Sequence, residues 1–267
     1  MDVHQLWPVI LLGIVQGIAE FLPISSSGHL VLVSSFLPDK STAATHHLAM
    51  NVALHLGTLG SILYVYRKDL RNVLFDLKML ISIVIATLPI VVFGLTLKDQ
   101  IESAFETPLV AACGLFVTAS LLFLSDWLSK QEPEGIQEAG TPSKIQALLI
   151  GMFQAIAIVP GISRSGSTIA GAVMLGQSRV SAARFSFLIA IPAILGATVL
   201  QLKDLLTESQ EPVAWMELAV GMLVSFVVGI GALELLLTMV RKNRLRYFAV
   251  YCLVVALAAL FWFSRSA

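Results

Sequence analysis

The hydrophobic positions of this chain form six long apolar runs that are separated by polar segments. The runs extend over residues 47–66, 76–96, 107–128, 184–202, 215–240 and 247–263. Each run has about 17–26 residues, and a helix of that length crosses a hydrocarbon core of about 30 Å. The runs are apolar on all sides, whereas a soluble surface helix carries one polar face. The pattern therefore predicts an all-α integral membrane protein with six membrane-spanning helices.

Two further apolar regions, residues 6–37 and 145–175, are interrupted by clusters of proline, glycine and serine. The halves on either side of each interruption have about 12–15 residues, which is too short to span a bilayer. Backbone that leaves the helix at membrane depth is tolerated only inside the protein or beside a water-filled cavity. We therefore predict two re-entrant helical hairpins whose tips lie inside the membrane. A single long kinked helix is the alternative for each region.

The two interrupted regions resemble each other in sequence. Gly13–His29 (GIVQGIAEFLPISSSGH) aligns with Gly151–Ser167 (GMFQAIAIVPGISRSGS) at a constant spacing of 138 residues. The same spacing, within one residue, relates Cys113 to Cys252. We therefore predict a single membrane domain made of two repeats, each a re-entrant hairpin followed by three spans. The first repeat covers 1–130, a linker covers 131–144, and the second repeat covers 145–267.

The distribution of charge predicts how the two repeats are oriented. Three spans per repeat is an odd number, so the second repeat must be inverted relative to the first. Lys and Arg collect in cytoplasmic loops. They crowd at two loops that an inverted arrangement brings to the same side: Arg67, Lys68, Arg71 and Lys78, and Arg241, Lys242, Arg244 and Arg246. We expect a multi-pass membrane protein with both termini on the side away from the cytoplasm.

Composition excludes several other classes of protein. Hydrophobic residues make up 57% of the 267 positions and charged residues only 13%, where a soluble domain has about 25% charged residues. Seventeen basic and seventeen acidic residues cancel, so no global field attracts a nucleic acid. Two cysteines cannot form a disulfide framework. Among the basic residues, only Arg164 belongs to neither predicted membrane surface.

Polar residues gather at the two predicted hairpin tips, and ionisable groups at membrane depth are functional candidates by default. Each tip precedes a half-helix whose free N–H groups favour an anion, and the planar guanidinium of Arg164 suits a phosphate. We therefore predict a diphosphate-binding cradle, although helix N-capping is the alternative for individual serines. The cradle comprises Ser25, Ser27, Gly28, Ser163, Ser165, Gly166, Ser167 and Thr168, with Arg164 between them.

The first tip also carries candidate catalytic groups. Gln16 and Glu20 are four residues apart and share one helix face, which suits a divalent cation such as Mg²⁺ or Ca²⁺. A salt bridge between Glu20 and Arg164 is the alternative. A serine near Glu20 and His29 could act as a nucleophile while the histidine moves its proton. His55, within a span, is interpreted as a hydrogen-bonded histidine of the bundle.

The motifs QGIAE (16–20), FLPISSSGH (21–29) and PGISRSGST (160–168) closely resemble those of the undecaprenyl-diphosphate phosphatases of the bacitracin-resistance type. The resemblance implies hydrolysis of undecaprenyl diphosphate to the monophosphate and inorganic phosphate, which recycles the lipid carrier for peptidoglycan synthesis. It also implies dependence on Mg²⁺ or Ca²⁺, and a location in the bacterial inner (plasma) membrane, where both termini would lie on the periplasmic side. By motif position, Glu20 would serve metal or base chemistry, Ser26 would be the nucleophile, His29 the acid/base or an alternative nucleophile, and Arg164 the diphosphate clamp.

Two aspects of this interpretation stay open. Gln16 stands at a motif position that admits either Glu or Gln, which leaves one anionic metal ligand fewer. A transporter or flippase of a lipid phosphate could share inverted repeats and a midplane anion site, but it would not need both Ser26 and His29. The expected partners are a polyprenyl diphosphate and membrane lipid, without nucleic acid, and a homodimer stays open.

Overall fold

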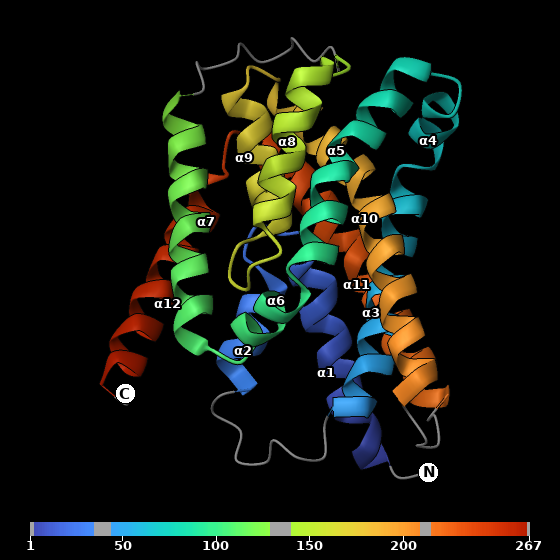
Figure 1. Ribbon diagram of the computed structural model, residues 1–267, viewed down its shortest axis with the longest axis vertical. Coiled ribbons are helices and arrows are strands. Elements are labelled where there is room, and N and C mark those ends of the chain that lie inside the picture. Colours follow the sequence, from blue (N-terminus) through green and yellow to red (C-terminus); the bar gives the residue numbers. More distant parts are fainter. Residues whose placement is uncertain (1–2, 35–43, 129–139, 209–214, 266–267) are drawn as a thin grey trace.

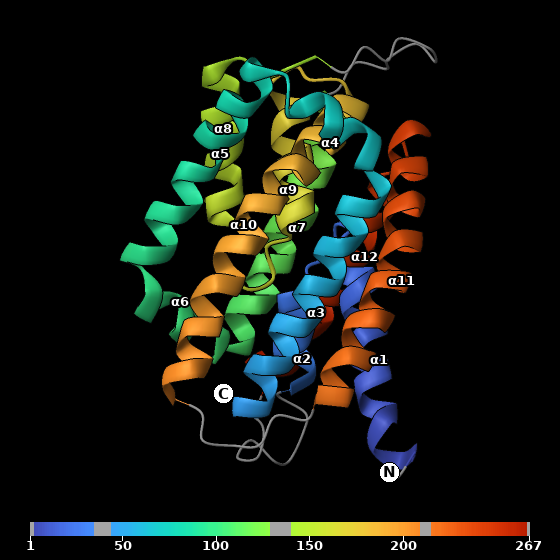
Figure 2. The same ribbon diagram turned by 90° about the vertical axis from the view of Figure 1, so that its right-hand side faces the viewer.

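The computed structural model describes residues 3–34, 44–128, 140–208 and 215–265, and within these ranges the chain forms twelve α-helices and no strand (Figures 1 and 2). The prediction of an all-α protein is confirmed. Of the predicted linker, 131–139 lies outside the described residues, and the helix that follows it begins at Lys144. Ser143 caps that helix: its hydroxyl accepts from the Gln146 N–H, and the Gln146 side chain accepts from the Ser143 N–H.

Among the described residues, six helices are long and apolar enough to cross a membrane. This confirms the six predicted spans. Their surfaces explain why the runs looked apolar on all sides. On α5, for example, Val84, Leu88 and Val92 follow one another at helical spacing and are each more than half exposed, as expected of a face turned toward lipid. The six helices are α3 (Ala44–Val65), α5 (Leu77–Thr96), α7 (Pro108–Leu128), α10 (Arg179–Glu208), α11 (Trp215–Arg241) and α12 (Arg246–Ser264).

Helix α10 begins five residues before the predicted run, because its charged first turns are neutralised by other helices. Arg179 lies 3.1 Å from Asp126 of α7. Arg184 donates two hydrogen bonds to Asp69, at 2.6 and 2.9 Å. The hydropathy pattern places the start of this span at a charged residue, Arg184. Because the charges of Arg179 and Arg184 are paired, the helix itself begins five residues earlier.

Each interrupted region forms two short helices joined by a turn, and the pairs occupy opposite halves of the molecule (Figures 1 and 2). Helices α1 (Val3–Ala19) and α2 (Ser26–Ser34) lie in the lower half, and α8 (Lys144–Ile156) and α9 (Arg164–Met174) in the upper half. The turns contain Pro23 and Pro160, and two residues with positive φ, Ser25 at 64° and Gly161 at 89°. Such residues end a right-handed helix.

Two short helices were not predicted from the sequence. Helix α4 (Arg67–Val73) follows the first span and α6 (Lys98–Phe105) follows the second. Both are polar loop segments by composition, so no hydrophobic run marks them. Helix α4 supplies Asp69 to the ion pair with Arg184, and α6 supplies Phe105 to the cavity described below.

Each broken pair packs against spans from the other end of the sequence. Helix α1 packs mainly on α11, and α8 packs mainly on α5. Close approach depends on glycines at equivalent repeat positions: a Cβ at Gly13 would lie 2.9 Å from Val224, and one at Gly151 would lie 2.5 Å from the Ala86 carbonyl oxygen. Small residues permit this close contact between membrane helices. Helices α7 and α12 also pack on each other, and α7 contacts α2 and α9.

Candidate active site

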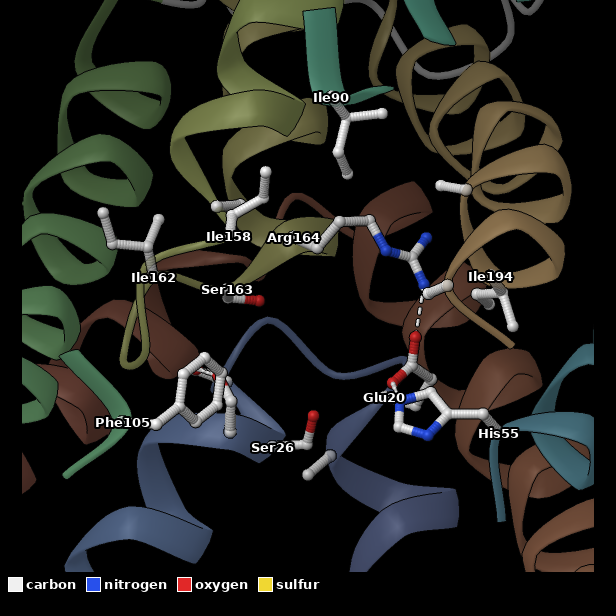
Figure 3. Close-up of a pocket in the computed structure, with 16 residues that line it drawn as sticks. Glu20, Ser26, His55, Ile90, Phe105, Ile158, Ile162, Ser163, Arg164 and Ile194 are labelled. Carbon is white, nitrogen blue, oxygen red and sulfur yellow. Dashed lines mark hydrogen bonds and ion pairs between the residues drawn. The ribbon is translucent and has the colours of Figure 1, made fainter. Parts of the chain in front are cut away.

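The turns of the two broken regions meet at a cavity of about 260 Å³ (Figure 3). Residues from α3, α5, α6 and α10 complete its wall. Its polar part is contributed by both turns, whereas most of the remaining lining is aliphatic or aromatic. The lining residues are Ala19, Glu20, Ser25, Ser26, Ser27, His55, Ile90, Phe105, Ala157, Ile158, Ile162, Ser163, Arg164, Ala193, Ile194 and Ala197.

The two turns are built by the same hydrogen bonds. The Gly28 N–H donates to Ser25 Oγ at 3.2 Å, and the Gly166 N–H donates to Ser163 Oγ at 3.1 Å. Ser25 Oγ also lies 3.3 Å from Ser27 Oγ, and the second turn repeats this contact between Ser163 and Ser165 at 3.2 Å. Ser25 and Ser163 therefore act as helix N-caps. This was the alternative considered for individual serines of the cradle.

An ion pair joins the two turns, and both of its residues line the cavity. Arg164 Nη2 donates to Glu20 Oε1 at 2.5 Å (Figure 3). The side chains of Arg164 and Glu20 are only 15% and 9% exposed. Gln16 Nε2 donates to the other carboxylate oxygen, Glu20 Oε2, at 3.0 Å. Within the described part of the chain, Arg164 Nη1 is buried without a hydrogen-bond partner, so the guanidinium keeps a donor that a further acceptor could use.

Ser26 differs from its neighbours in having a free hydroxyl. Its side chain lines the cavity and points into it (Figure 3), and among the described residues no hydrogen bond occupies Ser26 Oγ, whereas Ser25 and Ser27 contact each other. A hydroxyl that is not engaged elsewhere is the one available for nucleophilic attack. The geometry thus singles out Ser26 among the three serines of the first turn.

The predicted acid/base, His29, does not line the cavity. Its Nδ1 lies 2.8 Å from the Ser25 carbonyl oxygen and its Nε2 lies 2.8 Å from the Tyr251 hydroxyl. Both ring nitrogens are therefore occupied. The direction of the ring depends on Tyr251, which is 222 residues away in the sequence.

His55 is the histidine that lines the cavity. Its Nδ1 lies 2.8 Å from the Asn51 carbonyl oxygen, as expected of a hydrogen-bonded helix residue, but its Nε2 lies 3.9 Å from Glu20 Oε2 (Figure 3). The repeat relates this residue to another residue that lines the cavity. The spacing that pairs Gly57 with Gly196 also pairs His55 with Ile194, and both of these residues line the cavity.

The predicted site residues therefore fall into two groups, those that line the cavity and those that do not. Ser25, Ser26, Ser27, Ser163 and Arg164 line the cavity. The remaining predicted residues, Gln16, Gly28, His29, Ser165, Gly166, Ser167 and Thr168, do not.

The residues that do not line the cavity support the turns instead. A Cβ at Gly28 would lie 2.6 Å from Gly161 Cα, so Gly28 lets the two turns touch. Thr168 Oγ1 donates to the Arg164 carbonyl oxygen at 2.8 Å and lies 2.6 Å from Ser186 Oγ.

The cavity has enough oxygen ligands for a cation only if a bound ligand supplies most of the coordination shell of that cation. Glu20 is the one carboxylate that lines the cavity, and the described residues contain no cluster of three His, Cys, Asp or Glu side chains that could hold a metal. Gln16 turns its amide N–H toward Glu20 and is not part of the lining. One carboxylate is sufficient for Mg²⁺ where substrate phosphates provide further oxygens. Glu20 fits that role, and Gln16 does not.

A cavity between helices that combines a charged pair and serine hydroxyls with a largely apolar remaining wall is typical of a multi-pass membrane protein whose ligand is an amphiphilic anion. The family model of the bacitracin resistance protein BacA matches residues 9–258. The chain belongs to this family, which confirms the resemblance drawn from the two turn motifs.

Relatives named undecaprenyl-diphosphatase match over almost their whole length. The relative from Rhodopirellula baltica is 45% identical, with 95% of this chain and 96% of the relative covered. The relative from Desulfosudis oleivorans is 41% identical, with 92% and 94% covered. The relative from Alcanivorax borkumensis is 40% identical, with 96% and 98% covered. The range matched by the family model, 9–258, includes both turns and reaches into the last apolar helix.

Proposed function

We propose that this protein hydrolyses undecaprenyl diphosphate to undecaprenyl phosphate and inorganic phosphate, and thereby returns the lipid carrier to cell-wall synthesis. One observation carries the proposal: Ser26, Glu20 and Arg164 share a cavity whose other walls are mostly apolar. Such a cavity suits a diphosphate with a prenyl chain, because charged and hydrocarbon parts each find matching surface. Membership of the family and the names of the relatives agree with this activity. They do not favour the transporter alternative.

The reaction assigns separate tasks to the three residues. Ser26 Oγ attacks the terminal phosphorus, and its proton passes to a base, for which Glu20 is the carboxylate in the cavity. The bond between that phosphorus and the bridging oxygen breaks, and the electron pair leaves with the prenyl phosphate. Water then attacks the phosphoserine and releases inorganic phosphate. Arg164 donates to the phosphoryl oxygens throughout, which offsets the negative charge that the transition state gathers.

A divalent cation, Mg²⁺ or Ca²⁺, would be held by Glu20 together with the diphosphate, and would neutralise charge on the phosphoryl oxygens. A cation on Glu20 would weaken the ion pair with Arg164, and the guanidinium could then donate to the substrate. Gln16, which donates to Glu20 Oε2, holds the carboxylate in place from behind. Gln16 is thus a positioning residue in this scheme and not a metal ligand.

The test of this function is phosphate release from a C55-prenyl diphosphate by the purified protein in detergent. Wild type should release one phosphate per substrate, and Ser26→Ala should release almost none. The matched control is Ser120→Ala on α7, because Ser120 is exposed and bonds only to the Phe116 carbonyl oxygen of its own helix. Wild-type turnover in Ser26→Ala would contradict the assignment of the nucleophile. Absence of phosphate release from the folded wild type would contradict the function itself.

The arrangement of the two repeats is also part of the proposal. We infer that α1–α2 and α8–α9 are re-entrant hairpins that enter from opposite faces, as an inverted repeat requires. Three observations support this. The two turns have matching hydrogen bonds, and α1 and α8 each pack on a span of the other repeat. The two helix pairs also lie in opposite halves of the molecule (Figure 1). The end of the bundle that carries Arg71 and Lys242 would then face the cytoplasm, with the termini outside.

Single cysteines provide the test of orientation. Glu102 on α6 and Lys242 after α11 are both exposed. In a background with Cys113→Ser, Glu102→Cys should react with an impermeant maleimide added to intact cells, and Lys242→Cys should react only after the membrane is opened. Labelling of both from outside would contradict the inverted arrangement. Cys252 is buried and should stay unlabelled, which serves as the internal control.

A further inference from the structure

His29 is held by two partners that leave it no free ring nitrogen. A carbonyl oxygen can only accept, so the contact of 2.8 Å between Nδ1 and the Ser25 oxygen requires a proton on Nδ1. Nε2 of the neutral ring then accepts, and the Tyr251 hydroxyl at 2.8 Å is its donor. The two rings are nearly parallel, at an angle of 9° with centroids 5.6 Å apart. The Ser25 carbonyl therefore fixes the tautomer of His29, and Tyr251 fixes the plane of its ring.

The carbonyl that His29 holds belongs to the strained residue of the first turn. Ser25 has a φ of 64°, a left-handed conformation that a residue with a side chain rarely adopts unless its surroundings enforce it. Its carbonyl oxygen accepts from His29 twice, from the ring Nδ1 and from the backbone N–H at 3.3 Å. The next residue is Ser26. The direction of the Ser26 hydroxyl thus depends on a backbone conformation that His29 stabilises.

The second turn is held in an equivalent way by a different residue. Thr118 of α7 is fully buried, donates to the Gly161 carbonyl oxygen at 2.9 Å and accepts from the Ser163 N–H at 2.8 Å. Helix α7 is the third span of the first half, and α12, which carries Tyr251, is the third span of the second half. Each turn is therefore fastened by the last span of the opposite half.

We propose that Tyr251 is a positioning residue of the active site, which acts through His29 to hold the Ser25–Ser27 turn so that Ser26 points into the cavity. His29 then transmits this constraint and does not transfer a proton to or from the substrate. The inference rests on the proposed function, because it assigns Ser26 the reacting hydroxyl. It adds a residue of α12 that the turn motifs do not contain.

Four single variants and one double variant test the proposal by their kinetics. Tyr251→Phe removes the hydroxyl but keeps the ring, and should lower kcat about tenfold with little change in KM, because a positioning hydrogen bond is lost while substrate contacts remain. His29→Asn can still donate to the Ser25 oxygen from its amide, so it should retain much more activity than His29→Ala. The matched control is Tyr247→Phe, one turn earlier on α12 and equally exposed, which should behave as wild type. Adding Tyr251→Phe to His29→Ala should cause no further loss, since Tyr251 acts through His29.

The pH dependence of kcat separates positioning from proton transfer. If His29 only positions the turn, His29→Asn should keep the shape of the wild-type profile at lower amplitude. A lost limb of the profile, or equal inactivity of His29→Asn and His29→Ala, would overturn the proposal. Wild-type kcat in Tyr251→Phe would also overturn it. If Ser26→Ala remains inactive in that case, the proposed function survives without the positioning pair, so the two failures are distinguishable.

Discussion

The two turns of the molecule share their capping hydrogen bonds but carry different chemistry. In both, a serine caps the following helix and contacts a second serine two residues later. At equivalent repeat positions, however, Glu20 corresponds to Ile158, Ser26 to Arg164, and His29 to Ser167. The first turn therefore supplies a free hydroxyl and a carboxylate, and the second supplies a guanidinium.

This difference shows which features of a duplicated site must stay equal and which can diverge. The capping hydrogen bonds satisfy backbone groups that both turns expose in the same way, so both copies keep their serines. The cavity lies between the turns, and a single ligand needs only one nucleophile and one clamp. The residues that point into the cavity are thus free to differ, and the following predictions separate the scaffold from the chemistry.

The largest effect is expected for Ser26→Ala. If Ser26 is the nucleophile, kcat should fall by about 10⁴-fold or more, because no other hydroxyl in the described turns is both exposed to the cavity and free. Acid quenching of wild type with substrate labelled on the terminal phosphate should trap labelled protein, and Ser26→Ala should trap none. A loss below about tenfold would indicate direct attack by water.

Arg164→Ala should come next, with a loss of about 10²–10³-fold in kcat/KM, as for removal of a group that stabilises charge in the transition state. Glu20→Gln should cause a comparable loss, measured as phosphate release. Arg71→Ala on α4 and Glu102→Ala on α6 are exposed controls and should leave turnover unchanged. A wild-type rate in Arg164→Ala would assign the anion site to another part of the cavity.

Removal of divalent cations should lower turnover by about tenfold or more, since the cation neutralises phosphoryl charge. The measurement is phosphate release with EDTA and after re-addition of Mg²⁺ or Ca²⁺. Thermal unfolding in the absence of substrate should not change with EDTA, because the described residues hold no preformed metal cluster. A shift of Tm with EDTA alone would show that the protein binds the cation without the substrate.

The smallest effects are expected for the two capping serines. Ser25→Ala and Ser163→Ala each remove one cap, and each should lower the free energy of unfolding by about 1 kcal/mol. The two values should agree because the caps are equivalent. Thermal unfolding of the detergent-solubilised variants measures both, with Ser120→Ala as the reference. Clearly unequal losses would mean that the turns are not equivalent scaffolds.

Hydropathy and turn chemistry were sufficient to predict the six spans and the two interruptions, because both depend on local properties. Runs of apolar residues locate spans, and Pro23, Pro160 and Gly161 mark the breaks. The motifs also identified Glu20, Ser26 and Arg164, which the structure brings to one cavity.

Features that depend on distant partners could not be predicted. The direction of His29 is set by Tyr251, and the early start of α10 depends on the pair between Arg179 and Asp126. His55 looked like a bundle residue because its bond to Asn51 is local, while its exposure to the cavity follows from tertiary packing. The short helices α4 and α6 lack a hydrophobic run and gave no signal in the pattern.

In the ion pair between Glu20 and Arg164, the carboxylate occupies the guanidinium and therefore competes with any other anion for it. A carboxylate tethered 2.5 Å from the guanidinium is present at a high effective concentration, so any free anion must displace it to reach Arg164. A diphosphate has the charge to do so, because its phosphoryl oxygens attract Arg164, and a cation held by Glu20 would add to this effect. Inorganic phosphate, with less charge and no lipid chain, competes less well. The ion pair thus favours binding of the diphosphate substrate over binding of phosphate, and it favours release of the phosphate product.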